Sequence, residues 1–163
     1  MQAMEKNKRM PDMEETSVEK LRVLMIEDSA DCAALLNHIL LETKIFGDIK
    51  LFTSGEEGIK YLEEAKVRAS LPDLIFLDLN LPGEHGLETL VKIKNYSDFY
   101  SIPVVVMTAS DDRKDLLESY RKGVVFFIHK PLDKNLLIET LMHMKITGIL
   151  KKRSEKEKIC DYY

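Results

Sequence analysis

The chain has 163 residues, a net charge of −4 and two cysteines that lie far apart in the sequence. The mildly acidic balance argues against a domain-wide nucleic-acid interface, which is usually basic, and the cysteine spacing excludes a CxxC motif. No stretch approaches the roughly 18 consecutive apolar residues of a membrane span and the polar start is not a signal peptide, so we expect a soluble, cytosolic protein with one domain and free thiols.

The two ends of the chain carry opposite charges. Residues 1–19 contain three basic and five acidic side chains, a net charge of −2, and we expect them to form a polar N-terminal arm. Residues 148–163 contain five basic and three acidic side chains, a net charge of +2, which indicates a charged tail or an extension of the last helix. The folded domain is therefore expected within residues 20–147.

Short apolar runs alternate with amphipathic segments through this domain. Runs that are apolar on both faces are typical of strands buried in a parallel sheet, and such strands are expected at 23–26, 74–78, 103–108 and 124–128. A further short strand with alternating apolar residues is expected at 49–53. Helices are expected after each strand, at 29–41, 54–65, 86–94, 111–122 and 133–144. The first and last of them show apolar residues at helical spacing, whereas 111–122 is polar. Ser54 and Glu57 form a capping box at the second helix, and Gly123 is suited to end the fourth.

Five alternating strand–helix units predict a doubly wound α/β domain. Right-handed crossovers would place helices on both faces of a five-stranded parallel sheet. In open sheets of this kind, functional residues collect at the carboxyl ends of the strands. Those strand ends are therefore where a site is expected.

The expected strand ends carry a selective set of polar residues. The first strand is followed by Glu27 and Asp28, the third ends in Asp78, the fourth ends in Thr108, and Lys130 follows the fifth. Three carboxylates brought together need a counter-charge, and Mg²⁺ prefers such oxygen ligands. Because an aspartate can act as a nucleophile toward phosphorus, the set predicts a magnesium site beside a carboxylate that accepts a phosphoryl group.

Taken together, Glu27-Asp28, Asp78, Thr108-Ala109 and Lys130-Pro131 resemble the receiver domain of two-component response regulators. The spacings of 30 positions from Asp78 to Thr108 and of 22 positions from Thr108 to Lys130 fit that family. The resemblance covers residues 20–147. It implies a flavodoxin-like fold with the strand order 2-1-3-4-5.

The resemblance gives roles to the acidic residues and their neighbours. Asp78 corresponds to the phosphoacceptor. Mg²⁺ would be held by Asp78, by Asp28 directly and by Glu27 through water, together with the backbone carbonyl of Asn80. The side chains of Asn80 and Ser110 occupy positions that steer the attacking water in this family, so they are expected to set the phosphoryl lifetime.

The resemblance also gives roles to the ends of the fourth and fifth strands. Lys130 would contact the phosphoryl group, and Pro131 would follow a cis peptide bond, which X-Pro permits at modest cost. Thr108 and Phe127 would form the switch pair, in which the hydroxyl moves toward the phosphoryl group and the ring turns inward. Phe127 departs from the tyrosine that is frequent in the family, so any output that depends on that hydroxyl is in doubt.

The resemblance implies a signalling switch rather than an enzyme. A sensor histidine kinase would donate the phosphoryl group, and the domain itself would catalyse transfer and later dephosphorylation. Since about 16 residues follow Thr147, with no DNA-binding module among them, we expect output through contact with a downstream protein, without nucleic acid or a membrane span. The long spacing of 50 positions between Asp28 and Asp78 looks like the stand-alone receivers that partner bacterial phytochromes, which often form homodimers.

Two other functions remain open at this point. A phosphatase or mutase with an aspartyl-phosphate intermediate would carry a second aspartate two residues after its nucleophile, whereas this chain has Asn80 there. A docking module that is independent of phosphorylation has no need to keep the acidic pair together with Lys130. Taken singly, Asp78 could be a turn residue and Phe127 a core residue.

Overall fold

The structure is a computed structural model that describes residues 19–109 and 113–152. Within these ranges strands and helices alternate as β1 (Leu21–Ile26), α1 (Ala30–Glu42), β2 (Phe46–Phe52), α2 (Gly55–Val67), β3 (Leu74–Asp78), α3 (Gly86–Asn95), β4 (Val104–Thr108), α4 (Arg113–Arg121), β5 (Phe126–His129) and α5 (Lys134–Ile146). All strands are parallel, in the order β2-β1-β3-β4-β5. The predicted doubly wound fold is confirmed.

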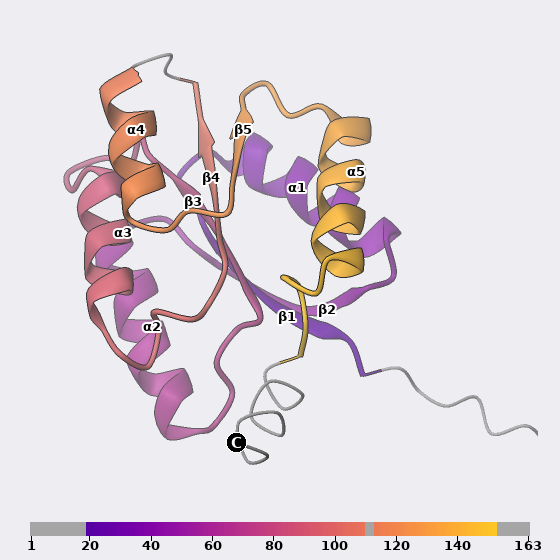
Figure 1. Cartoon of the computed structure of the whole chain (residues 1–163), viewed down its shortest axis with the longest axis horizontal. Helices are drawn as coiled ribbons and strands as arrows, with labels where there is room; N and C mark the ends of the chain where they lie inside the picture. The colour runs from indigo at the N-terminus through magenta and orange to yellow at the C-terminus, as the bar shows by residue number, and fades with distance from the viewer. Residues whose placement is uncertain (1–18, 110–112, 153–163) are drawn as a thin grey trace, which may run out of the picture.

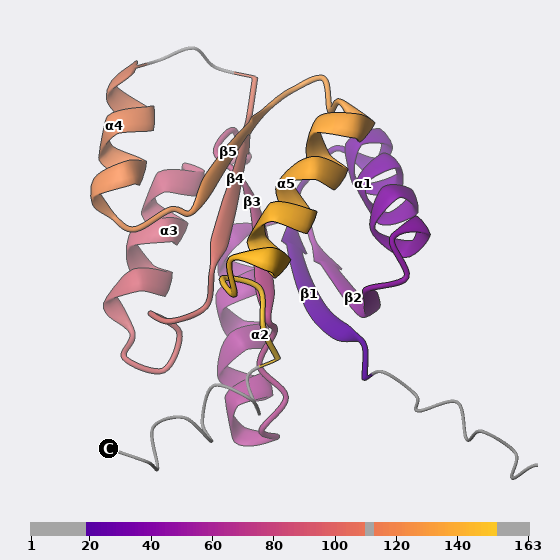
Figure 2. The same cartoon turned by 45° about the vertical axis from the view of Figure 1, so that its right-hand side comes forward.

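Helices cover both faces of the sheet, with α1 and α5 on one face and α2, α3 and α4 on the other (Figures 1 and 2). The division follows the alternation of side chains along β1. Val23 and Met25 belong to the buried cluster that contains the apolar residues of α1 and α5, whereas Leu24 and Ile26 belong to the cluster that contains those of α2 and α3. In the described ranges, no helix has the length and apolar character needed to cross a membrane.

The edge strands differ from the prediction more than the central ones. β3 spans the predicted residues, and all five are buried. β2 begins at Phe46 rather than at residue 49, because Phe46 pairs with Leu21 and Asp48 pairs with Arg22 of β1, with a register shift at the intervening Gly47, although glycine and aspartate are poor strand formers. β5 begins at Phe126 rather than at residue 124, although the Val125 N–H already donates to the Val104 carbonyl.

The chain continues in contact with the domain after α5. Leu150 is 3% exposed and belongs to the same core cluster as Leu21. The Leu150 N–H donates to the Met144 carbonyl, and Lys152 Nζ lies 2.5 Å from a carboxylate oxygen of Glu19. Residues 148–152 of the expected tail are thus packed against the domain, while residues 1–18 and 153–163 lie outside the described residues.

We expect Leu150→Ala to lower the free energy of unfolding by about 2 kcal/mol, because it removes a buried side chain and leaves a cavity. Urea unfolding followed by circular dichroism measures the change. Lys151→Ala is the matched control, since Lys151 is exposed and should leave stability within about 0.5 kcal/mol. Equal stability of the two variants would show that this segment does not contribute to the core.

Candidate functional site

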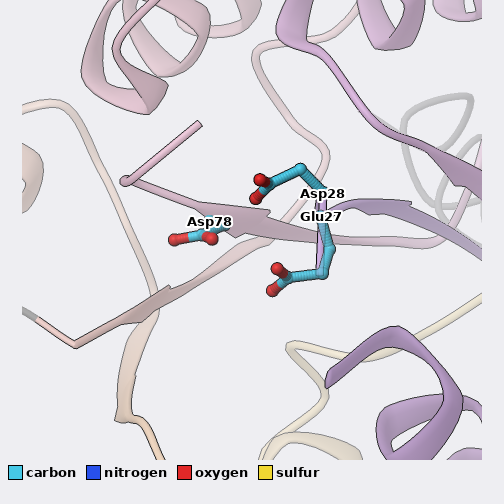
Figure 3. Close-up of side chains that lie close together, drawn as sticks. All are labelled: Glu27, Asp28 and Asp78. Carbon is cyan, nitrogen blue, oxygen red and sulfur yellow. The ribbon is translucent and has the colours of Figure 1, made fainter. Parts of the chain in front are cut away.

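Three carboxylates converge at the carboxyl ends of β1 and β3. Parallel pairing of Ile26 with Leu77 places these two strand ends side by side. Glu27, Asp28 and Asp78 each direct a carboxylate oxygen into the same space, and these oxygens lie within 4.8 Å of one another (Figure 3). Glu27 and Asp78 are buried, while Asp28 is exposed. The structure therefore brings together the acidic residues selected from the sequence.

Lys130 provides the counter-charge from the end of β5. Its Nζ lies 2.6 Å from Glu27 Oε2 and 2.8 Å from Asp78 Oδ2. Burial disfavours the charged ammonium, but the hydrogen bond to Asp78 and the negative charges of both carboxylates outweigh this effect and raise the pKa of Lys130 above its usual value. The stabilisation by these ion pairs is therefore present below the ordinary lysine pKa and is lost only as the pH rises through the folded-state value.

Backbone N–H groups fix the remaining oxygens of the buried carboxylates. The Asn80 N–H donates to Asp78 Oδ1 at 2.9 Å, and the Ser29 N–H donates to Glu27 Oε1 at 3.0 Å. Ser29 is also the N-cap of α1, where its hydroxyl accepts from the Cys32 N–H. The contribution of Ser29 was not predicted, although a serine directly after an acidic pair is the available signal for such a cap.

The donor set suits a divalent cation. Glu27 Oε2 is buried and in ionic contact with Lys130, yet no described donor is aligned to give it a hydrogen bond. Among described residues, none forms a hydrogen bond or ion pair with the Asp28 carboxylate. Three carboxylates against one ammonium leave two negative charges, which matches Mg²⁺ or a similar oxygen-seeking ion.

Gly86 allows α3 to begin directly against the backbone of Asp78 and Leu79. A Cβ atom at this position would lie 2.1 Å from the Asp78 carbonyl oxygen and 2.6 Å from Leu79 Cα. The Gly86 N–H donates to the Leu79 carbonyl, and His85 Nδ1 caps the helix by accepting from the Leu87 N–H. This role of Gly86 was not predicted, although a glycine at the start of an amphipathic helix that follows a strand end is the signal for it.

The remaining predicted residues lie along β4 and β5. Thr108 is fully buried at the end of β4, next to β3. Phe127 pairs with Val106, which places Phe127 and Thr108 on the same face of the sheet as diagonal neighbours. The ring of Phe127 is partly exposed and packs on Tyr120 of α4, with the ring centroids 4.7 Å apart. The Lys130–Pro131 bond is cis, and Ser110 lies outside the described residues.

Comparison with known proteins agrees with this geometry. The family model described as the response regulator receiver domain matches residues 23–142. The chain belongs to the response regulator receiver family. It is similar to the response regulator Rcp1 of Synechocystis sp., with 33% identity over 110 residues that make up 66% of this chain and 75% of that protein.

Solved structures lead to the same family. A phosphorylated cyanobacterial phytochrome response regulator, RcpA, superimposes with a TM-score of 0.68 and 29% identity over 78% of this receiver chain and 92% of its own. The Mn²⁺-bound form of Rcp1 gives a TM-score of 0.67 and 28% identity over 81% and 96% of the two chains. The predicted resemblance to receivers of the phytochrome-associated type is confirmed, and the receiver domain is a module of two-component signalling, in which histidine kinases supply phosphoryl groups.

Lys130→Met should destabilise the metal-free receiver domain by about 2 kcal/mol, because it leaves buried carboxylates without their cation while it retains the apolar stem. Adding Mg²⁺ should raise the melting temperature of this variant more than that of the unchanged protein, since no ammonium competes for the carboxylates. Lys134→Met removes an exposed ion pair with Glu42 and serves as the control. Equal stability of the two variants without Mg²⁺ would contradict the prediction.

Proposed function

We propose that this receiver domain accepts a phosphoryl group on Asp78 from a sensor histidine kinase, in a reaction that depends on Mg²⁺. The observation that carries the proposal is the arrangement around Asp78. Its Oδ2 accepts a hydrogen bond from Lys130 Nζ at 2.8 Å and its Oδ1 accepts one from the Asn80 N–H at 2.9 Å, beside the carboxylates of Glu27 and Asp28. A nucleophile, a cation and an acidic metal-binding pair thus share one strand-end site.

In the proposed reaction, a carboxylate oxygen of Asp78 forms a bond to phosphorus, and the bond from phosphorus to the imidazole nitrogen of the donor breaks. The product is an acyl phosphate, and the kinase histidine leaves as a neutral imidazole after protonation. Lys130 would exchange its contact with the carboxylate for one with a phosphoryl oxygen. The buried hydroxyl of Thr108, on the neighbouring strand end, would donate to another phosphoryl oxygen.

The proposed metal ligands are Asp28, Asp78, the backbone carbonyl of Asn80 and, through water, Glu27. The buried Glu27 Oε2 without a hydrogen bond and the unpartnered Asp28 carboxylate, both within the described residues, support this assignment. A bound Mg²⁺ ion would neutralise the charge that develops on the phosphoryl oxygens. The Mn²⁺-bound form of the similar protein Rcp1 supports a divalent cation here.

The proposed output is a change on the face formed by α4, β5 and α5. Movement of the Thr108 hydroxyl toward the phosphoryl group would vacate space beside its diagonal neighbour Phe127. Since the Phe127 ring packs on Tyr120, its displacement would also change the position of α4. A downstream protein or a second copy of the chain would bind this face, while Asn80 and Ser110 would set how long the phosphoryl group persists. The proposed reaction with a histidine kinase would take place in the cytoplasm.

Incubation with Mg²⁺ and acetyl phosphate tests the proposal. The intact protein should gain the mass of one phosphoryl group, and peptide mapping after borohydride reduction should place it on Asp78. EDTA should abolish the gain, and hydroxylamine should remove the group, as expected of an acyl phosphate. Phosphorylation at another residue, or at an equal rate in EDTA, would contradict the proposal.

A further inference from the structure

The strand β2 forms an open edge of the sheet. Among the described residues only β1 pairs with it, and Gly47, Asp48, Lys50 and Leu51 are all exposed (Figure 2). An edge strand presents backbone N–H and C=O groups that can pair with a strand of another chain. Proteins often keep such edges very short, whereas β2 spans seven residues. The outer side of β2 is therefore long enough to pair with a further strand.

The direction of the outer backbone groups follows from the pairing with β1. The register between the two strands is regular over residues 48–52 of β2, and the Phe52 carbonyl accepts a hydrogen bond from the Glu27 N–H. Because successive carbonyl groups point to opposite sides of a strand, every second residue of β2 directs its backbone groups toward β1. The N–H and carbonyl groups of Ile49 and the N–H group of Leu51 therefore point outward.

Asp48 and Lys50 carry opposite charges on the same face of β2, one on each side of Ile49. Lys50 Nζ lies 3.3 Å from Asp48 Oδ1, and the two side chains are 50% and 48% exposed. An exposed ion pair of this kind contributes little to stability, so both charges can take another partner at little cost. Charged side chains often protect an edge strand from pairing, but here the order of the charges is complementary to its own antiparallel copy.

We propose that β2 pairs with β2 of a second copy of this chain, in an antiparallel arrangement centred on Ile49. A twofold axis at Ile49 places each Asp48 opposite Lys50 of the other copy, so that ion pairs form on both sides of the axis. Each Ile49 N–H donates to the Ile49 carbonyl of the other copy, and each Leu51 N–H donates to the opposite Gly47 carbonyl. The sheets of the two copies then form one continuous sheet.

This interface does not depend on the proposed phosphorylation. Its residues belong to β2, which lies at the opposite edge of the sheet from β5. None of them is a ligand or a neighbour of the phosphoryl group in the proposed reaction at Asp78. A dimer formed through β2 leaves the proposed output face of α4, β5 and α5 free on both copies, so that one dimer presents this face twice.

Sedimentation velocity of the full-length protein over a series of concentrations, without a phosphodonor, tests the proposal. We expect a reversible dimer, and slower hydrogen exchange at the backbone amides of Ile49 and Leu51 as the dimer forms. Asp48→Lys and Lys50→Glu should each weaken the dimer at least about tenfold, because each places like charges opposite one another on both sides of the axis. Lys145→Glu is the control, since it makes the same change of charge at an exposed position of α5.

Mixing the two β2 variants gives the most specific test. When Asp48→Lys pairs with Lys50→Glu, opposite charges again face each other at both positions, so the heterodimer should form within about threefold of the original affinity. The proposal is overturned if the unchanged protein stays monomeric, if both β2 variants dimerise with unchanged affinity, or if their mixture associates no more tightly than either variant alone. Should a variant fail to fold, hydrogen exchange at Ile49 and Leu51 of the unchanged protein decides the matter, because a dimer that leaves these amides unprotected does not use β2.

Discussion

Replacing Asp78 with Asn is expected to reduce phosphoryl labelling to background and to stabilise the unphosphorylated domain by about 1 kcal/mol in the absence of Mg²⁺. An amide oxygen is too weak a nucleophile to form the acyl phosphate. The same oxygen can still accept the hydrogen bond that Lys130 donates to Asp78, whereas one of three converging negative charges is removed. Loss of function and gain of stability should therefore occur in one variant.

Intact-mass measurement with acetyl phosphate and urea unfolding in EDTA check the two parts of this prediction. Asp28→Asn is the matched variant, because it removes a charge from the same cluster and leaves the nucleophile in place. It should be labelled slowly and require more Mg²⁺. If Asp78→Asn were labelled as well as the unchanged protein, Asp78 would not be the phosphoacceptor.

Gly86→Ala is expected to lower the free energy of unfolding by about 3 kcal/mol. The new Cβ would overlap two backbone atoms, the Asp78 carbonyl oxygen and Leu79 Cα, rather than the end of a flexible side chain. Relief requires α3 or the end of β3 to move, which displaces the carboxylate of Asp78. Phosphorylation by acetyl phosphate should therefore slow together with the loss of stability.

Gly83→Ala is the control variant, because it also replaces a glycine but introduces no steric overlap. Gly83 lies in the same connection at φ +83°, but a Cβ there has no atom within 4 Å. Its replacement should cost about 1 kcal/mol of backbone strain and leave the labelling rate unchanged. Urea unfolding and labelling rates compare the two variants. Similar losses in both would mean that the close approach at Gly86 is not what positions Asp78.

The central part of the fold was predictable because burial on both faces leaves a strong signal. β3 has five buried residues after a proline break, and its predicted limits are confirmed. The predicted edge strand β2 was too short because its first residues include Gly47 and Asp48, which have no strand preference of their own. The strand begins earlier because Phe46 and Asp48 pair with β1 on either side of Gly47, and no local pattern contains that information.

The candidate site shows the same division between local and distant information. Acidic residues and Lys130 were predictable because parallel strands bring their carboxyl ends to one edge. Residues that act through a backbone N–H, such as Ser29, or through a missing Cβ, such as Gly86, were not predicted, because their signals are positional and their side chains take no part in the chemistry of the site. Likewise, residues 148–163 were predicted as a charged tail because of their many lysines and glutamates, so the buried position of Leu150 was not predicted.

The ion pair between Lys152 and Glu19 brings the first and last described residues to the same edge of the domain, away from Asp78. The Nζ of Lys152 also donates to the Lys20 carbonyl at 3.0 Å. These two positions are close enough to be joined by a short linker, which costs little loop-closure entropy. A circularly permuted chain, reopened in an exposed connection, should therefore retain the phosphoryl site. Fluorescent labels placed at Glu19 or Lys152 would lie away from the proposed output face formed by α4, β5 and α5.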